Sequence, residues 1–323
     1  MSIQAGLVGL PNVGKSTLFN ALTKSSVPAE NYPFCTIDPH HAITEVPDTR
    51  LDQLQQIYGS QKKLPASVSF VDIAGLVKGA ASGEGLGNQF LSHIREVDLI
   101  LHVLRCFEDP NIMHHGETID PLEDYKTIVA ELMLKDLESV EKRLERLPKL
   151  IRGAQGNERK DLEVEQVLLQ SIHNALDLGD AQEVRRLIVS SPIATIPLLT
   201  AKNYLIIANI DEKELDSYEK NPHYQTLVQH FGKDRVIPIS AKIEYEISQL
   251  KPEDAEELMG LLGMKEPGLH TIIRKTYEHL GLITFFTCGP KEAHAWPIKQ
   301  GTTARQARSE EHTSELQSQN RIS

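Results

Sequence analysis

The chain has few cysteines and few aromatic residues. Its 323 residues include three cysteines and one tryptophan, and 5% of the side chains are aromatic. Cys35, Cys106 and Cys288 lie far apart, which excludes a disulfide framework and gives no zinc-binding spacing, so we expect reduced thiols. The sequence also lacks an apolar run of membrane-spanning length and a signal-peptide pattern at its N-terminus. These absences predict a cytoplasmic protein without a membrane partner.

Positive charge is also in deficit. The chain has 34 lysines and arginines against 45 aspartates and glutamates, a formal net charge of -11 at pH 7. Because nonspecific binding to nucleic-acid phosphates needs an excess of lysine and arginine, we expect no direct DNA binding. A content of 40% hydrophobic and 24% charged residues is typical of a globular protein. The length of the chain allows one large domain with an appendage, or two or three domains.

Residues 9–16 carry the most informative motif, GLPNVGKS, which matches G-x-x-x-x-G-K-[ST]. The motif follows a strand-like run, Ile3–Val8, and precedes a helical pattern over Thr17–Lys24. In such a loop the backbone N–H groups surround a phosphate, Lys15 reaches the β- and γ-phosphates and Ser16 can ligate Mg²⁺. The predicted phosphate-binding residues are Asn12, Val13, Gly14, Lys15, Ser16 and Thr17, with Lys15 also catalytic.

A second acidic group is expected near the metal, at the end of a strand. Asp72 opens the D-x-x-G motif that ends at Gly75 and follows the apolar run Val68–Val71, so we expect Asp72 to hold Mg²⁺ through water. Thr36, in a polar loop between the two motifs, is the candidate to complete the magnesium site in the triphosphate state. The alternative for Thr36 is an ordinary surface-loop threonine. The predicted metal-binding residues are therefore Ser16, Thr36 and Asp72.

Two later segments have the form of base-recognition loops. Asn209, Ile210 and Glu212 stand where GTPases carry N-K-x-D, but the lysine is missing and a longer acid replaces the aspartate. This difference weakens the case for guanine and leaves adenine open. Ser240 and Ala241 begin an S-A-K sequence of the type that packs on the base in the same superfamily. We therefore expect all five residues to bind nucleotide.

The catalytic machinery departs from that of Ras-like GTPases. Leu76 stands where those enzymes place the glutamine that orients the attacking water. Hydrolysis must therefore use another polar group or be slow. His114 and His115, in the loop after the run Leu99–Leu104, are candidates, with solvent-exposed bystanders as the alternative.

The order of apolar runs predicts an α/β fold with a mostly parallel sheet and helices on both faces. Strand-like runs alternate with helical or polar stretches, at 68–71, 99–104, 204–208 and 236–239. Two long helices are predicted over 125–147 and 157–176. They are expected to form an antiparallel hairpin inserted into the nucleotide-binding domain, or else an ordinary packed pair.

The C-terminal region predicts a helix from Gly268 to about Leu280 and two strands, 282–287 and 293–298, which open a small β-rich domain. Residues 308–323 have no hydrophobic periodicity and resemble the translation of a sequencing adaptor. We interpret this tail as an artefact. A natural polar, disordered tail is the alternative.

The motifs together resemble the Obg-like ATPase, or YchF, family. The resemblance extends over about residues 3–307 and is carried by residues 9–23, 31–37, 72–79 and 83–91, with Asn209 and Glu212. It implies a P-loop NTPase domain of the OBG type over 1–280, with a helical hairpin insert at about 125–190. It also implies a C-terminal truncation, because 281–307 supplies only the beginning of a β-grasp TGS domain and 308–323 falls outside.

The same resemblance implies an activity: slow hydrolysis of Mg·ATP, in preference to GTP, by a ribosome-associated switch. It implies that His114 takes part in hydrolysis and that a hydrophobic residue replaces the glutamine, as Leu76 does. Asn12 is similar to the asparagine that coordinates K⁺ in potassium-stimulated relatives, so Mg²⁺ and K⁺ are the cofactors considered. Two alternatives stay open: a GTPase in which Glu212 imitates the aspartate, and a nucleotide-gated binding module whose hydrolysis is incidental.

Overall fold

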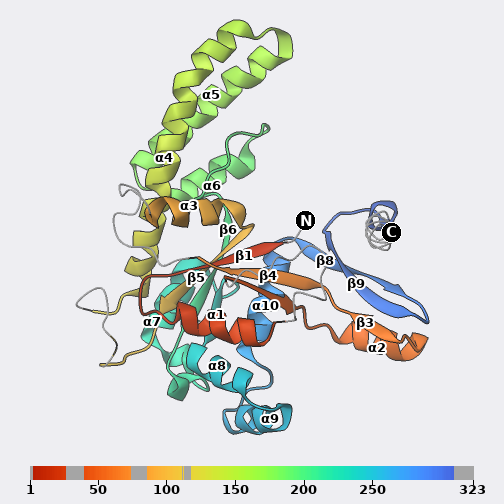
Figure 1. Ribbon diagram of the computed structural model, residues 1–323. Coiled ribbons are helices and arrows are strands. Elements are labelled where there is room, and N and C mark those ends of the chain that lie inside the picture. The colour runs from red at the N-terminus through yellow and green to blue at the C-terminus, as the bar shows by residue number, and fades with distance from the viewer. Residues whose placement is uncertain (1–2, 27–39, 74–85, 111, 113–117, 309–323) are drawn as a thin grey trace. The chain divides into compact units, whose positions relative to one another are not determined.

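The computed structural model describes residues 3–26, 40–73, 86–110, 112 and 118–308 (Figure 1). The chain divides into two compact units. The first unit consists of residues 1–5, 16–71 and 239–323, and the second of residues 6–15 and 72–238. Hydrogen bonding orders the strands as β2-β4-β1-β5-β6-β7 in the main sheet and as β3-β9-β8 in a small sheet.

The main sheet confirms the predicted α/β class. Its strands are β1 (Gln4–Val8), β2 (His41–Glu45), β4 (Ser67–Asp72), β5 (Leu99–Arg105), β6 (Asn203–Asn209) and β7 (Val236–Ile239). β5 pairs in parallel with β6, with Leu99 opposite Asn203. Every residue of β5 is buried, as expected for a parallel strand covered on both faces. β2 lies at one edge of the sheet and pairs antiparallel with β4, and the sequence did not predict this strand.

The first unit also contains the small sheet, whose strands are β3 (Lys62–Leu64), β8 (Leu282–Cys288) and β9 (Glu292–Lys299). The helices of this unit are α1 (Lys15–Lys24), α2 (Thr49–Tyr58), α8 (Ala241–Gln249), α9 (Pro252–Leu261) and α10 (Gly268–His279). β8 and β9 correspond to the two strands predicted over 282–287 and 293–298, and they pair antiparallel. A third strand, β3, pairs in parallel with β9. More than half of the chain separates the two strands, so no local pattern predicts this pairing.

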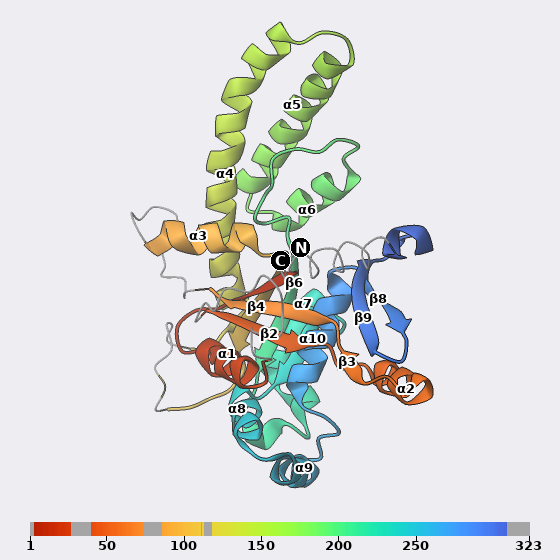
Figure 2. The same ribbon diagram turned by 45° about the vertical axis from the view of Figure 1, so that its right-hand side comes forward.

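The second unit carries the helical insert. Its helices are α3 (Leu86–Glu96), α4 (Pro121–Gly153), α5 (Gly156–Asp177), α6 (Ala181–Ser190) and α7 (Pro222–Phe231). Figures 1 and 2 show α4 and α5 side by side, extending away from β5 and β6. Asp120 begins α4 by accepting hydrogen bonds from the N–H groups of Leu122 and Glu123, both at 3.0 Å. The helix therefore starts earlier than the sequence predicted.

Buried apolar side chains hold the two long helices together. Val140 and Leu147 of α4 and Leu169 of α5 are fully buried in one core cluster. Leu134 of α4 is 53% exposed and lies outside this cluster.

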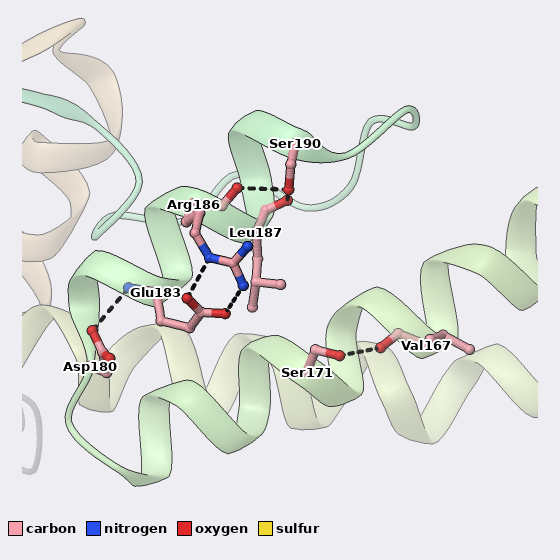
Figure 3. Close-up of polar contacts among 7 residues, drawn as sticks. All are labelled: Val167, Ser171, Asp180, Glu183, Arg186, Leu187 and Ser190. Atoms are coloured by element: carbon pink, nitrogen blue, oxygen red, sulfur yellow. Dashed lines mark hydrogen bonds and ion pairs between the residues drawn. The ribbon is translucent and has the colours of Figure 1, made fainter.

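A third helix of the insert, α6, was not predicted separately. Figure 3 shows its polar contacts: Asp180 caps it by accepting from the Glu183 N–H at 2.9 Å, and Arg186 donates to Glu183 at 2.6 Å. These local contacts explain why the chain turns after α5 and forms a short helix of its own. In the described part of the chain, no helix has both the length and the apolar character that a membrane span requires.

Asp136 attaches α4 to the segment that leads into β6. Its buried carboxylate accepts hydrogen bonds from the Leu199 N–H at 2.8 Å, the Thr200 N–H at 2.8 Å and the Thr200 hydroxyl at 2.7 Å. Burial raises the pKa of Asp136, while these hydrogen bonds act in the opposite direction. Because β6 ends at Asn209, this attachment also fixes the strand that carries the base-side residues.

Candidate nucleotide-binding site

The loop between β1 and α1 has the backbone that a phosphate cradle requires. Asn12 has φ 64° and Gly14 has φ 93°, both in the left-handed region that glycine and asparagine tolerate best. At Gly9, a Cβ atom would lie 2.8 Å from the Val103 carbonyl oxygen and 2.8 Å from a methyl carbon of Val13. Only glycine fits this close approach of the loop to β5. The residue types of the motif therefore follow from the geometry of the turn.

Lys15 and Asp72 meet at the end of this loop. Lys15 is the first residue of α1, is 8% exposed, and donates a hydrogen bond from Nζ to Oδ1 of Asp72, the last residue of β4. The predicted phosphate-binding lysine and the predicted metal-binding carboxylate are thus neighbours. When phosphate and a cation enter, the Lys15 ammonium can bind the phosphate and the Asp72 carboxylate can bind the cation.

The base-side segment is tied to the same loop. Asn209, the last residue of β6, is buried and donates from Nδ2 to the Val13 carbonyl oxygen at 2.8 Å. Ile210 is buried beside it, and Glu212, half-buried, begins the short 3₁₀ helix η2 (Glu212–Glu214). Residues nearly two hundred positions apart in the sequence, 13 and 209, are therefore in direct contact, as a site for one nucleotide requires.

Asn221 stabilises η2 and was missed by the sequence analysis. Its buried Nδ2 donates to the Cys106 carbonyl oxygen at 2.9 Å and to a Glu214 carboxylate oxygen at 2.8 Å. Its Oδ1 accepts from the Tyr224 N–H at 2.9 Å and so begins α7. The Asn-Pro pair at the start of a helical pattern was the available signal, but it indicated only a helix cap.

The remaining predicted residues are distributed as follows. Ser16 is exposed on the first turn of α1 and Thr17 is half-buried. Ser240 and Ala241, in the first unit, are buried where β7 passes into α8. Thr36, Gly75, Leu76, His114 and His115 lie outside the residues that the structure describes. Their roles in the switches and in catalysis stay predictions.

Arg105 organises the segment that leads to His114. It ends β5, is 1% exposed, and donates to three backbone carbonyl oxygens: Phe107 at 3.1 Å, Asp109 at 3.2 Å and Ile112 at 3.1 Å. Its guanidinium carbon also lies 4.6 Å from the centre of the Phe107 ring. The signal in the sequence is a charged residue at the end of an otherwise apolar strand, which by itself indicates only where the strand ends.

Replacing Arg105 by methionine should destabilise this segment. The substitution keeps the apolar stem but leaves three carbonyl groups without their donor, a loss of about 2–3 kcal/mol. In a chain of this size that loss corresponds to a fall in thermal midpoint of about 5 °C, measurable by circular dichroism. The rate of nucleotide hydrolysis should fall about tenfold if the segment positions a catalytic group. Arg159→Met, on the exposed face of α5, is the matched control, and unchanged values in both variants would refute this role of Arg105.

Comparison with known proteins places these features in a family. A family profile described as "50S ribosome-binding GTPase" matches residues 4–143. The profile of the YchF GTPase C-terminal domain, described as a protein of unknown function, matches residues 282–318. The second match overlaps the segment 308–323, whose artefactual origin stays a prediction.

Curated relatives match almost the whole chain. "Ribosome-binding ATPase YchF" from Escherichia coli O157:H7 is 44% identical over 320 residues, covering 97% of this chain and 85% of the relative. The protein of the same name from Bacillus subtilis is 42% identical over 309 residues, covering 94% and 83%. The solved structure of the Schizosaccharomyces pombe YchF GTPase superposes with a TM-score of 0.78 at 38% identity, over 97% of this chain and 85% of that chain. The chain therefore belongs to the YchF family of P-loop nucleotide hydrolases.

Proposed function

We propose that this chain is a cytoplasmic, ribosome-associated switch that binds Mg·ATP in preference to GTP and hydrolyses it slowly. The observation that carries the proposal is the hydrogen bond from Asn209 to the Val13 carbonyl oxygen, 2.8 Å long. It joins the base-side segment to the phosphate loop, at whose other end Lys15 meets Asp72. Relatives named ribosome-binding ATPases, at 44% and 42% identity, support the nucleotide and the partner.

The preference for adenine rests on Glu212. The aspartate of N-K-x-D accepts two hydrogen bonds from the N1–H and the 2-amino group of guanine. Glutamate is longer by one methylene, and Glu212 sits in a turn whose position is fixed by the Asp211 carboxylate, which accepts from the Lys213 N–H at 2.9 Å. A displaced carboxylate loses the paired geometry that selects guanine, whereas adenine lacks both of those donors.

At the phosphate-binding loop, Lys15 exchanges its carboxylate partner for the phosphates of the nucleotide. The backbone N–H groups of the loop and the Lys15 ammonium bind the β- and γ-phosphates, and Lys15 leaves Asp72 to do so. The carboxylate of Asp72 is then free to face a cation. This exchange links occupancy of the phosphate site to the end of β4, which leads directly into the D-x-x-G segment.

The residues fit a magnesium site of the kind that nucleotides complete. Among the described residues, no cluster of three or more histidine, cysteine or acidic side chains could hold a metal alone. Mg²⁺ needs no such cage, because one or two protein oxygens with water and phosphate oxygens complete its octahedron. Ser16 and Asp72 supply a hydroxyl and a carboxylate, with Thr36 proposed as the third group. When bound, Mg²⁺ neutralises charge that develops on the phosphates.

Removal of cations should therefore stop turnover. Phosphate release from ATP is expected to fall about a hundredfold in excess EDTA and to recover with added Mg²⁺. Asp72→Asn should need about tenfold more Mg²⁺ for half-maximal rate, because the amide is a weaker ligand. Replacing K⁺ by Na⁺ should also slow the reaction if Asn12 helps to hold K⁺. Equal rates in the two salts would exclude potassium stimulation, and EDTA-resistant turnover would exclude the magnesium site.

The switch function requires that nucleotide change the affinity for a partner. We expect more of the chain to sediment with ribosomes in the presence of a non-hydrolysable ATP analogue than without nucleotide. Equal sedimentation under the two conditions would contradict a nucleotide-dependent switch while leaving ATP hydrolysis itself untouched.

A further inference from the structure

The segment that follows β6 is held in a closed ring of hydrogen bonds. At one side of the ring, the carbonyl oxygen of Asn209 accepts from the Cys106 N–H at 2.8 Å. The Cys106 carbonyl oxygen accepts from Nδ2 of Asn221 at 2.9 Å, and the same Nδ2 donates to the Glu214 carboxylate at 2.8 Å. The chain from Asn209 to Glu214 closes the ring. Glu212, the residue proposed to select the base, therefore lies within it.

Asn221 is the junction of this ring, and every hydrogen-bonding group of its side chain is used. The two N–H bonds of its Nδ2 serve two acceptors, and its Oδ1 accepts from the Tyr224 N–H at 2.9 Å. The residue is 5% exposed, so water cannot readily replace a lost partner. Aspartate lacks the donor and serine lacks the amide, so neither can make all three contacts.

The helix α7 anchors the junction. The Asn221 N–H donates to the Tyr218 carbonyl oxygen at 3.0 Å, in the short 3₁₀ helix η3 (Tyr218–Lys220). The Tyr218 ring packs edge-on against the ring of Tyr224, which is 4% exposed, with the centroids 5.2 Å apart. The amide of Gln225 donates to the Glu219 carbonyl oxygen at 2.9 Å. The position of η2 is therefore set by contacts with a packed helix.

The ring also reaches the phosphate-binding loop. Asn209 belongs to the ring through its backbone, and its side chain donates to the Val13 carbonyl oxygen at 2.8 Å. One continuous network thus connects the loop expected to hold the phosphates with the turn that carries Glu212. Selection between two bases requires the selecting group to be held in a fixed position relative to the phosphates.

We propose that Asn221 is a positioning residue for base selection, which holds η2 through Glu214 and so keeps Glu212 where it disfavours guanine. The direction of the selection rests on the proposed preference for ATP. The positioning role itself requires only that the turn around Glu212 faces the base.

Equilibrium binding of ATP, GTP and inorganic tripolyphosphate to the nucleotide-free full chain, all with Mg²⁺, tests the proposal. Asn221→Asp keeps the oxygen that caps α7 but places a second oxygen against two acceptors. We expect the ratio of the dissociation constants of GTP and ATP to fall about three- to tenfold. Tripolyphosphate, which has no base, should bind within about twofold of the wild type.

Variants of Glu214 isolate the contact with η2. Glu214→Ala removes that contact and leaves the bond from Asn221 to Cys106 in place, so the ratio should fall as in Asn221→Asp. Glu214→Gln retains an oxygen that can accept the hydrogen bond and should restore the wild-type ratio. Asn157→Asp adds the same charge on the exposed first turn of α5 and should bind all three ligands like the wild type.

Two results would overturn the proposal. One is an unchanged ratio in Asn221→Asp and Glu214→Ala. The other is equal weakening of all three ligands, which would indicate damage to the whole site, with thermal midpoints showing whether the variants are folded. A wild-type chain that binds GTP more tightly would contradict the proposed ATP preference instead. The positioning role would then be confirmed by a rise of the ratio in the two variants and refuted by its constancy.

Discussion

Replacing Lys15 by methionine should lower the kcat for ATP hydrolysis about a thousandfold and weaken ATP binding about tenfold or more. Lys15 is 8% exposed, so its ammonium acts where water screens charge poorly. Methionine keeps an unbranched apolar stem of similar length, so the start of α1 keeps its packing. The phosphates lose their closest cation, and the charge that develops on them during transfer is no longer stabilised.

Lys24→Met is the matched control for this variant. Lys24 lies on the last turn of the same helix and is exposed, so the same substitution there should leave turnover unchanged. Because Asp72 also loses its ion-pair partner in Lys15→Met, the thermal midpoint must be measured beside the kinetics. A Lys15→Met protein that is folded and hydrolyses ATP at the wild-type rate would refute the proposed phosphate site.

His114→Ala is expected to lower kcat about a hundredfold while the dissociation constant for ATP stays within a factor of about two. The reason is that Leu76 cannot orient water, so the reaction needs another polar group, and the proposed group is the imidazole of His114. Sedimentation with ribosomes in the presence of ATP should persist in this variant, because binding of nucleotide and partner does not require the chemical step.

The neighbouring histidine provides the comparison. His115→Ala should retain nearly full turnover if only one of the two side chains acts. If His115→Ala is the slow variant, the roles of the two histidines are exchanged. If both variants hydrolyse ATP at the wild-type rate, neither residue takes part, and the group that replaces the glutamine lies elsewhere.

The phosphate end of the site could be predicted because its residues are fixed by local geometry. A turn with positive φ at Asn12 and Gly14 and a close approach at Gly9 restrict the residue types, so the motif appears in the sequence. Asp72 could be placed because it follows directly after a strand. The structure then brings Lys15 and Asp72 into contact.

The supporting residues could not be predicted, because their contacts join distant segments. Asn221 contacts Cys106 across more than a hundred positions, and nothing in the local sequence around either residue indicates that pairing. The pairing of β3 with β9 has the same cause. Arg105 acts on backbone carbonyl groups, which every residue carries, so no particular residue types mark its partners. Burial of its charge became visible only in the fold.

The central claim is that this site prefers adenine to guanine, and equilibrium binding tests it directly. The dissociation constants of ATP and GTP are measured on one nucleotide-free preparation, with Mg²⁺ and fluorescent analogues or titration calorimetry. The account predicts at least about tenfold tighter binding of ATP, since a displaced Glu212 carboxylate removes the paired hydrogen bonds that guanine needs. Tenfold tighter binding of GTP would contradict the account and make the chain a GTPase in which Glu212 replaces the aspartate.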